Sequence, residues 1–247
     1  MKKFPIFQKV GRADVKSLES CDQLLLILPT KPAAEHFRKL PESGKLQAVF
    51  RKSVSGSTPA FTSRLTNGRQ TLVVAGTLSK NASAFEQLSL GRQLVTAACG
   101  EKAGSLGICV VGFDSADAID IYGSVLAAGL AAAFELPAYK SKKSQAKIKS
   151  IRLIGADEKI DTKRTEAEAS GNNLARWLST MPPNKLDAVG YTKLIRAMAK
   201  QQQWACKRLG TAELTKLGAG AFLAVAQGND NDSAGIIRLR YRPGKRT

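Results

Sequence analysis

The residues of this chain that could carry out chemistry are few and lie apart in the sequence. The single histidine, His36, lies in PAAEHFRKL among charged residues. No G-x-S-x-G sequence supplies the nucleophile that a histidine-based hydrolytic site would need. We therefore predict that His36 lies on a helix surface. Cys99 and Cys109 fall in apolar helical and strand patterns, where cysteine usually acts as a small core residue.

Carboxylates that could hold a metal ion are also sparse. A two-metal hydrolytic site needs several carboxylates, often with a lysine, to bind hard cations and activate water. Asp230 and Asp232 in GNDND could chelate a cation, but the sequence lacks the glycine and distal glutamate of a calcium loop. We interpret GNDND as a surface turn. The sequence predicts no catalytic residue, no metal ligand and no cofactor site in this chain.

The most unusual feature of the composition is the excess of positively charged residues. The chain has 38 Lys and Arg against 20 Asp and Glu, a net charge of +18 that is spread over both halves. The densest group lies in AYKSKKSQAKIKS, where little aromatic character is available for base stacking. This group could bind nucleic-acid phosphates nonspecifically, or it could be a solvated loop. The candidate nucleic-acid-binding residues are Lys140, Lys142, Lys143, Lys147 and Lys149.

Composition limits the remaining classes of protein. A chain of 247 residues allows roughly one to two domains. Its apolar runs are too short, or too small in side chain, to span a bilayer, and no membrane partner is expected. The opening MKKFPIFQKVGRADVK lacks the apolar stretch of a secretory signal. Four cysteines without a C-x-x-C pair fit neither a disulfide framework nor a zinc knuckle, and they favour a reducing cytoplasm.

The elements that must position these residues alternate between strands and helices. In the first 155 residues the patterns predict strands at 23–28, 61–65, 70–75, 106–111 and 148–154, and helices at 83–99 and 118–136. Asn67-Gly68 predicts a tight antiparallel hairpin between the second and third strands. This order favours a mixed α/β sheet that is covered on both faces.

The pattern changes after Gly155. An amphipathic stretch at 162–180 predicts a connecting helix, which the prolines at 182 and 183 end because proline lacks the N–H group. Asp187 is the expected cap of a further helix that runs to about residue 203. A strand at 204–209 and a short helix capped by Thr211 are predicted to follow. A second α/β segment therefore begins after the proline pair.

A set of residues between 170 and 243 carries a resemblance to a known family. The set comprises Ala175-Arg176, Leu178, Pro182-Pro183-Asn184, Leu214, Leu217-Gly218, Gly220, Leu223-Ala224-Val225, Gln227-Gly228 and Tyr241. With these residues the segment resembles the start of the catalytic domain of the cytosolic leucyl aminopeptidases, two-metal enzymes that remove N-terminal residues from peptides. It departs from the family at Ala219, where methionine is common, and at NDNDSAG, where a serine- and proline-rich turn is usual.

The resemblance implies an organisation of the chain. Residues 1–155 would form an amino-terminal α/β domain similar to macro domains, residues 156–181 a linker helix, and residues 182–247 the incomplete opening of a zinc-exopeptidase-like catalytic domain. For a full-length member the resemblance implies two divalent ions, zinc or manganese, peptide substrates, a homohexamer and a cytoplasmic location.

The resemblance also exposes an absence in the sequence. Family members take their metal ligands and catalytic lysine and arginine from a lysine followed by F-D-S-G-G and from N-T-D-A-E-G-R, and neither motif occurs here. We therefore expect a truncated part of a leucyl-aminopeptidase-like protein that is inactive by itself. The alternative is a non-enzymatic basic protein derived from that family, which binds nucleic acid or an acidic partner.

Overall fold

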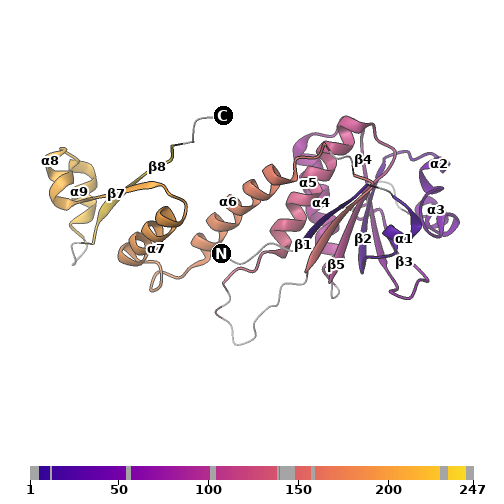
Figure 1. Cartoon of the computed structure of the whole chain (residues 1–247), viewed down its shortest axis with the longest axis horizontal. Coiled ribbons are helices and arrows are strands. Elements are labelled where there is room, and N and C mark those ends of the chain that lie inside the picture. The colour runs from indigo at the N-terminus through magenta and orange to yellow at the C-terminus, as the bar shows by residue number, and fades with distance from the viewer. Residues whose placement is uncertain are drawn as a thin grey trace. The chain divides into compact units, whose positions relative to one another are not determined.

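The chain forms two compact units. In the computed structural model these are Met1–Arg176, here called unit 1, and Trp177–Thr247, here called unit 2 (Figure 1). The structure describes residues 6–11, 13–53, 57–100, 104–137, 139, 148–156, 159–228 and 233–242. The division of the chain at residues 155 and 181 stays a prediction.

Unit 1 is built around a six-stranded sheet with the order β1-β6-β5-β2-β4-β3. All neighbouring strands are parallel except β3, which runs antiparallel to β4. The chain therefore has the mixed α/β sheet that its sequence predicts. The strands are β1 (Ile6–Val10), β2 (Gln23–Pro29), β3 (Phe61–Arg64), β4 (Leu72–Leu78), β5 (Ser105–Val110) and β6 (Ser150–Ile154).

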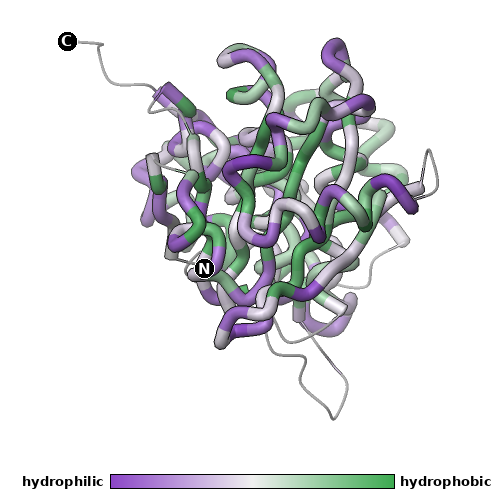
Figure 2. Tube along the Cα trace, turned by 90° about the vertical axis from the view of Figure 1, so that its right-hand side faces the viewer, coloured by the Kyte–Doolittle hydropathy of each residue, from purple (hydrophilic) through white to green (hydrophobic). Residues whose placement is uncertain are grey.

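The central strand β2 explains why the sequence QLLLIL is continuously apolar. Helices cover both faces of the sheet, so no residue of β2 is exposed. Its side chains alternate between two hydrophobic clusters: Leu25 and Ile27 belong to one, and Leu24, Leu26 and Leu28 to the other. Figure 2, in which unit 1 faces the viewer, shows hydrophobic segments mainly in its middle.

Helices from different parts of unit 1 cover the two faces of the sheet. Residues of α4 (Ala84–Ala98) and α5 (Ser115–Ala133) contribute to the cluster that contains Leu25. The opposite cluster takes residues from three short helices, of which the sequence analysis anticipated only the one that carries His36. Each helix has only about one to two and a half turns, too few for a clear periodic pattern. These are α1 (Val15–Leu18), α2 (Ala34–Phe37) and α3 (Ser43–Arg51).

The helix α5 is tied to the sheet by a buried phenol. Tyr122 Oη donates a hydrogen bond to the Ile154 carbonyl, 2.6 Å away, and accepts one from Val110 N, 3.1 Å away. One helix contact also depends on a glycine, because a Cβ atom on Gly91 of α4 would lie 3.2 Å from the Cα atom of Val125. Small residues thus allow α4 and α5 to pack closely.

The hairpin between β3 and β4 differs from the predicted one. The strands pair antiparallel as expected, but the loop runs from residue 65 to residue 71, so the expected tight turn at Asn67-Gly68 is wrong. The residue with positive φ is Gln70, at 49°. The Asn67 carboxamide shapes the loop instead: its Oδ1 accepts from Thr71 N at 3.0 Å, and its Nδ2 donates to the Glu19 carbonyl at 3.2 Å.

The connecting helix α6 (Thr162–Thr180) has the bounds that the sequence predicts. Arg176 Nη1 donates to the Ala131 carbonyl at 2.9 Å and to Asn173 Oδ1 at 2.8 Å. Asn173 is buried, and its Nδ2 donates to the Leu130 carbonyl at 3.5 Å. Because carbonyls in the last turn of a helix lack intrahelical partners, these two side chains satisfy the end of α5.

Unit 2 contains a two-stranded antiparallel sheet and three helices among its described residues. They are α7 (Ala188–Gln201), β7 (Ala205–Gly210), α8 (Thr211–Lys216), α9 (Gly220–Ala226) and β8 (Gly235–Arg240). Asp187 caps α7 as predicted, and its Oδ1 accepts from Gly190 N at 2.6 Å. The predicted cap at Thr211 is wrong, because Thr211 is already the first helical residue and Gly210 precedes it.

One described helix, α5, is long and apolar enough to cross a membrane by length and composition alone. In this fold it lies in the core of unit 1, where Val125, Leu126 and Leu130 are buried. Core helices of soluble proteins meet the same criterion. The absence of a membrane partner therefore stays a prediction.

Candidate functional site

The predicted nucleic-acid-binding lysines cannot be assembled into one surface. Lys140, Lys142, Lys143 and Lys147 lie outside the residues that the structure describes. Lys149 is exposed directly before β6, and its backbone N donates to the Gly104 carbonyl at 2.8 Å. The role of this group stays a prediction.

His36 lies on the short helix α2, but its ring is more covered than the sequence suggested. Its Nδ1 accepts a hydrogen bond from Ala33 N at 3.2 Å, and its Nε2 lies 3.9 Å from Glu35 Oε1. A Cβ atom on Gly112, which has a φ of 85°, would come within 2.7 Å of the ring. The side chain is 21% exposed. His36 therefore packs against the loop that follows β5.

The cysteines in the apolar patterns are structural. Cys109 is fully buried in β5, and desolvation raises the pKa of its thiol to about 12. Desolvation also raises the pKa of the buried Cys21. Cys99, partly buried, packs against the cluster of α4 and α5. Since the thiolate is the nucleophile, the two buried thiols are poorly suited to nucleophilic chemistry.

The carboxylates in the segment from 173 onward do not fit a two-metal site. Asp187 caps α7, and Glu213 forms an ion pair with Lys207 at 2.9 Å. Asp230 and Asp232 lie outside the described residues. Within the described ranges, no group of three or more His, Cys, Asp and Glu side chains gathers. The absence of metal ligands therefore stays a prediction.

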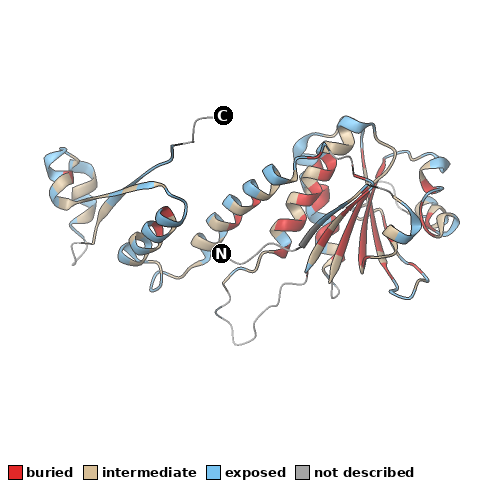
Figure 3. Cartoon of the chain, viewed as in Figure 1, coloured by how far each residue is buried: buried red, intermediate tan, exposed pale blue. Residues whose placement is uncertain are grey.

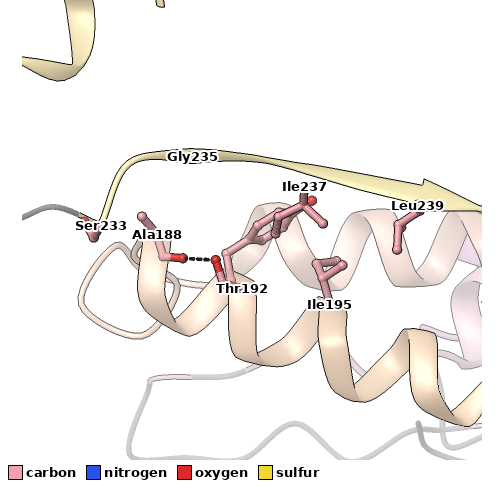
Figure 4. Close-up of a pocket in the computed structure, with 8 residues that line it drawn as sticks. Ala188, Thr192, Ile195, Ser233, Gly235, Ile237 and Leu239 are labelled. Atoms are coloured by element: carbon pink, nitrogen blue, oxygen red, sulfur yellow. Dashed lines mark hydrogen bonds between the residues drawn. The ribbon is translucent and has the colours of Figure 1, made fainter. Parts of the chain in front are cut away.

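Unit 2 contains a groove of about 220 Å³ between α7 and β8 (Figure 4). The Thr192 hydroxyl donates to the Ala188 carbonyl at 2.8 Å, so its proton is already used within the helix. The described residues that line the groove include no acid, base or thiol, and several of them offer apolar side chains. Its lining residues are Ala188, Tyr191, Thr192, Ile195, Ser233, Gly235, Ile237 and Leu239.

The strands of unit 2 also carry cations that the sequence analysis did not single out. Lys207 on β7 lies directly opposite Arg238 on β8, and Arg240 follows on the same side of β8. The available signal was the alternation of apolar and basic residues in GIIRLR. Its meaning depends on the register with β7, which sequence patterns alone did not provide.

Comparison with known proteins extends the resemblance. Residues 173–247 match the family model described as the cytosol aminopeptidase family, catalytic domain. A probable cytosol aminopeptidase of Parasynechococcus marenigrum is 28% identical over 224 residues, which cover 88% of this chain and 45% of the relative. The chain is therefore similar to cytosol aminopeptidases, and the family model itself covers its last 75 residues, 173–247.

Solved leucyl aminopeptidases share the fold. A mutant of the tomato leucine aminopeptidase matches with a TM-score of 0.77 at 18% identity, over 100% of this chain and 53% of the solved one. The bottromycin maturation enzyme BotP, in complex with Mn, matches with a TM-score of 0.57 at 19% identity, over 86% of this chain and 43% of the solved one. The chain therefore spans about half the length of the solved proteins it matches.

Proposed function

We propose that this chain supplies the amino-terminal domain, the linker helix and the first catalytic-domain elements of a leucyl-aminopeptidase-like enzyme that removes N-terminal residues from peptides. The continuity of the match carries the proposal, because one alignment to a cytosol aminopeptidase extends through both units. In this proposal residues 1–155 form the amino-terminal domain, residues 156–181 the linker, and residues 182–247 the opening of the catalytic domain.

We place the metal site outside these 247 residues. Neither family motif that supplies metal ligands occurs in the sequence, and both described carboxylates that follow residue 173 in unit 2 already have structural partners. In a full-length member, two divalent ions, zinc or manganese, would activate water and polarise the scissile carbonyl. The BotP neighbour is a complex with Mn. The 247-residue chain would thus be inactive by itself.

An activity assay tests this placement. The purified chain should not hydrolyse leucine p-nitroanilide or dipeptides when manganese or zinc is added. Metal-dependent turnover that a chelator abolishes would show that the site lies within the chain. An intact-mass measurement of the protein isolated from its natural source tests whether a longer enzyme exists. A protein longer than 247 residues supports the proposal, and a protein of 247 residues favours the non-enzymatic alternative.

Location and assembly follow the family in this proposal. The curated relatives are named cytosol aminopeptidases, and we propose a cytoplasmic location. A homohexamer would belong to the full-length protein. We expect the 247-residue chain to be a monomer or small oligomer, and light scattering that shows a stable hexamer would contradict this.

A second candidate function rests on the net charge of +18. In this alternative the chain is a non-enzymatic protein whose basic surface engages nucleic acid or an acidic partner. Generic, salt-sensitive binding is expected of any strongly basic protein, and only a loss specific to the lysines at 140–149 would favour a dedicated site.

A further inference from the structure

The helix α6 contains a weak segment near its middle. Residues 171–173 are Gly-Asn-Asn, and both residue types are poor helix formers. A Cβ atom on Gly171 would meet none of the described residues within 4 Å, so no neighbouring group requires a glycine at this position. The glycine therefore weakens α6 without serving close packing.

Few side chains of α6 are buried against unit 1. The 19 residues of α6 bury only Ala169 and Asn173, whereas α5, which has the same length, buries seven. Figure 3 shows α6 mainly in the colours of intermediate and exposed residues. Ala169 buries a single methyl group, so the hydrophobic effect contributes little at this point. Polar contacts therefore provide a large part of the attachment of α6.

These polar contacts lie directly after Gly171. Asn173 and Arg176 are three residues apart and so lie on the same side of α6. Arg176 Nη1 donates to the Ala131 carbonyl at 2.9 Å and to Asn173 Oδ1 at 2.8 Å, and Asn173 Nδ2 donates to the Leu130 carbonyl at 3.5 Å. A cation at the end of a helix is also favourable for the helix dipole. We call these contacts of Asn173 and Arg176 with α5 the polar clamp.

The start of α6 has a separate anchor. The side chain of Ile160 is 4% exposed, and its carbonyl accepts a hydrogen bond from Lys9 Nζ of β1 at 2.7 Å. Asp161 Oδ1 accepts from Arg164 N at 3.0 Å and so caps the first turn. The start of α6 would therefore stay attached to unit 1 if the polar clamp opened.

We propose that residues 171–173 are a hinge within α6 that the polar clamp holds closed. While the clamp is formed, α6 is continuous and the direction in which the chain leaves unit 1 is fixed. When the clamp opens, residues 171–176 lose their helical hydrogen bonds, because a Gly-Asn-Asn segment does not sustain a helix without tertiary contacts. Such local opening is characteristic of segments with few buried apolar contacts.

Hydrogen exchange measured by mass spectrometry on the 247-residue chain tests the polar clamp. Arg176→Met keeps a long unbranched side chain at an exposed position but removes the donors. It should accelerate exchange of the amides of residues 171–176 roughly tenfold, the effect of about two lost hydrogen bonds. Exchange of residues 162–168 should stay within about twofold, and exchange of β2 should not change. Arg176→Lys keeps a cation and should recover part of the protection.

A matched control and a compensating variant sharpen this test. Arg164→Met makes the same change on the same helix at a side chain that is 77% exposed, and should leave exchange of residues 171–176 within about twofold. Gly171→Ala raises helix propensity without adding a contact, so it should slow exchange of these residues about fivefold. It should do so both alone and in combination with Arg176→Met.

Three outcomes would overturn the proposal. Unchanged exchange of residues 171–176 in Arg176→Met would show that the polar clamp does not hold the helix. Equal acceleration of these residues and of β2 would show that Arg176 supports the whole of unit 1 rather than a local hinge. Gly171→Ala without slower exchange would show that the glycine is not a hinge. Because these measurements use no peptidase activity, the proposal and the enzymatic assignment can fail independently.

Discussion

The two units expose their strands very differently. In unit 1 no residue of β2 is exposed, whereas in unit 2 four of the six residues of β8 are exposed (Figure 3). Unit 1 has a hydrophobic cluster on each face of its sheet. The buried apolar side chains of the described part of unit 2 are Ile195, Ala199 and Leu214. Unit 1 therefore has a buried core on each face of its sheet, whereas the described part of unit 2 buries few apolar side chains.

The largest expected effect is on independent folding. Residues 1–181, which keep α6 whole, should unfold in a single cooperative thermal transition, because they contain both faces of the covered sheet. Residues 182–247 should show no such transition, since two strands rarely form a stable sheet alone. Calorimetry of the two fragments measures this. A cooperative transition of the second fragment would contradict the comparison.

The next largest difference between the two units should be the loss of stability when one apolar side chain is truncated. Leu26 is fully buried, and Leu26→Ala should lower the free energy of unfolding by about 2–5 kcal/mol through lost burial and a cavity. Val225 in α9 is 84% exposed, and Val225→Ala should change stability by no more than about 0.5 kcal/mol. Urea denaturation of both variants provides the test. Equal losses would show that Val225 is buried in the folded protein.

A buried phenol gives a smaller contrast. Tyr122→Phe leaves the Ile154 carbonyl and Val110 N without their partner, and should cost about 1–3 kcal/mol. Tyr191 of unit 2 lines the open groove and is 41% exposed, so Tyr191→Phe is the matched control with an expected loss below about 0.5 kcal/mol. Chemical denaturation measures both. A neutral Tyr122→Phe would mean that other groups replace the hydroxyl.

Acid stability should also depend on unit 1. Hydrogen bonds from Lys45 and Thr66 lower the pKa of Glu42 to about 2, below the ordinary value of 4.5. Because the pKa of Glu42 is lowered in the folded state, its ionised carboxylate stabilises the fold when the pH is above the ordinary pKa of 4.5. This contribution is lost as the pH falls from 4.5 toward 2. Glu42→Gln should therefore cost up to about 1 kcal/mol at pH 7, and the difference should shrink below pH 4.5.

A matched carboxylate in unit 2 controls this prediction. The ion pair with Lys207 lowers the pKa of the exposed Glu213. In the 247-residue chain, Glu213→Gln should leave the thermal transition of unit 1 unchanged, because Glu213 and Lys207 both lie in unit 2. Thermal melts across pH 2–7 measure both variants. A Glu42→Gln penalty that is constant over this range would show that charge at Glu42 is not responsible.

The smallest expected difference concerns DNA binding. Replacing Lys140, Lys142, Lys143, Lys147 and Lys149 by Gln should weaken affinity for duplex DNA about as much as replacing five exposed cations elsewhere. Generic binding depends on the number of released counterions rather than on one surface. Fluorescence titrations at several salt concentrations compare the two variants. A much larger loss for the 140–149 variant, with a flatter salt dependence, would establish a dedicated site.

The sequence by itself determined those elements whose signals are local. The proline pair and the amphipathic stretch before it predicted α6 at its observed bounds, Thr162–Thr180. The run QLLLIL predicted β2, because a strand covered on both faces must be apolar along its length. The family resemblance also came from sequence, since it rests on residue identities between 170 and 243.

Tertiary structure decided what depends on residues far apart in the chain. The strand β1 was missed because it pairs with β6, whose residues lie more than a hundred positions away. The loop at Asn67 differs from the predicted turn because its carboxamide bonds to Glu19, which belongs to another segment. In unit 2, Lys207 lies directly opposite Arg238 because of the register between β7 and β8. Local periodicity predicts which face of a strand a side chain occupies, but the strand that lies beside it is set by long-range pairing.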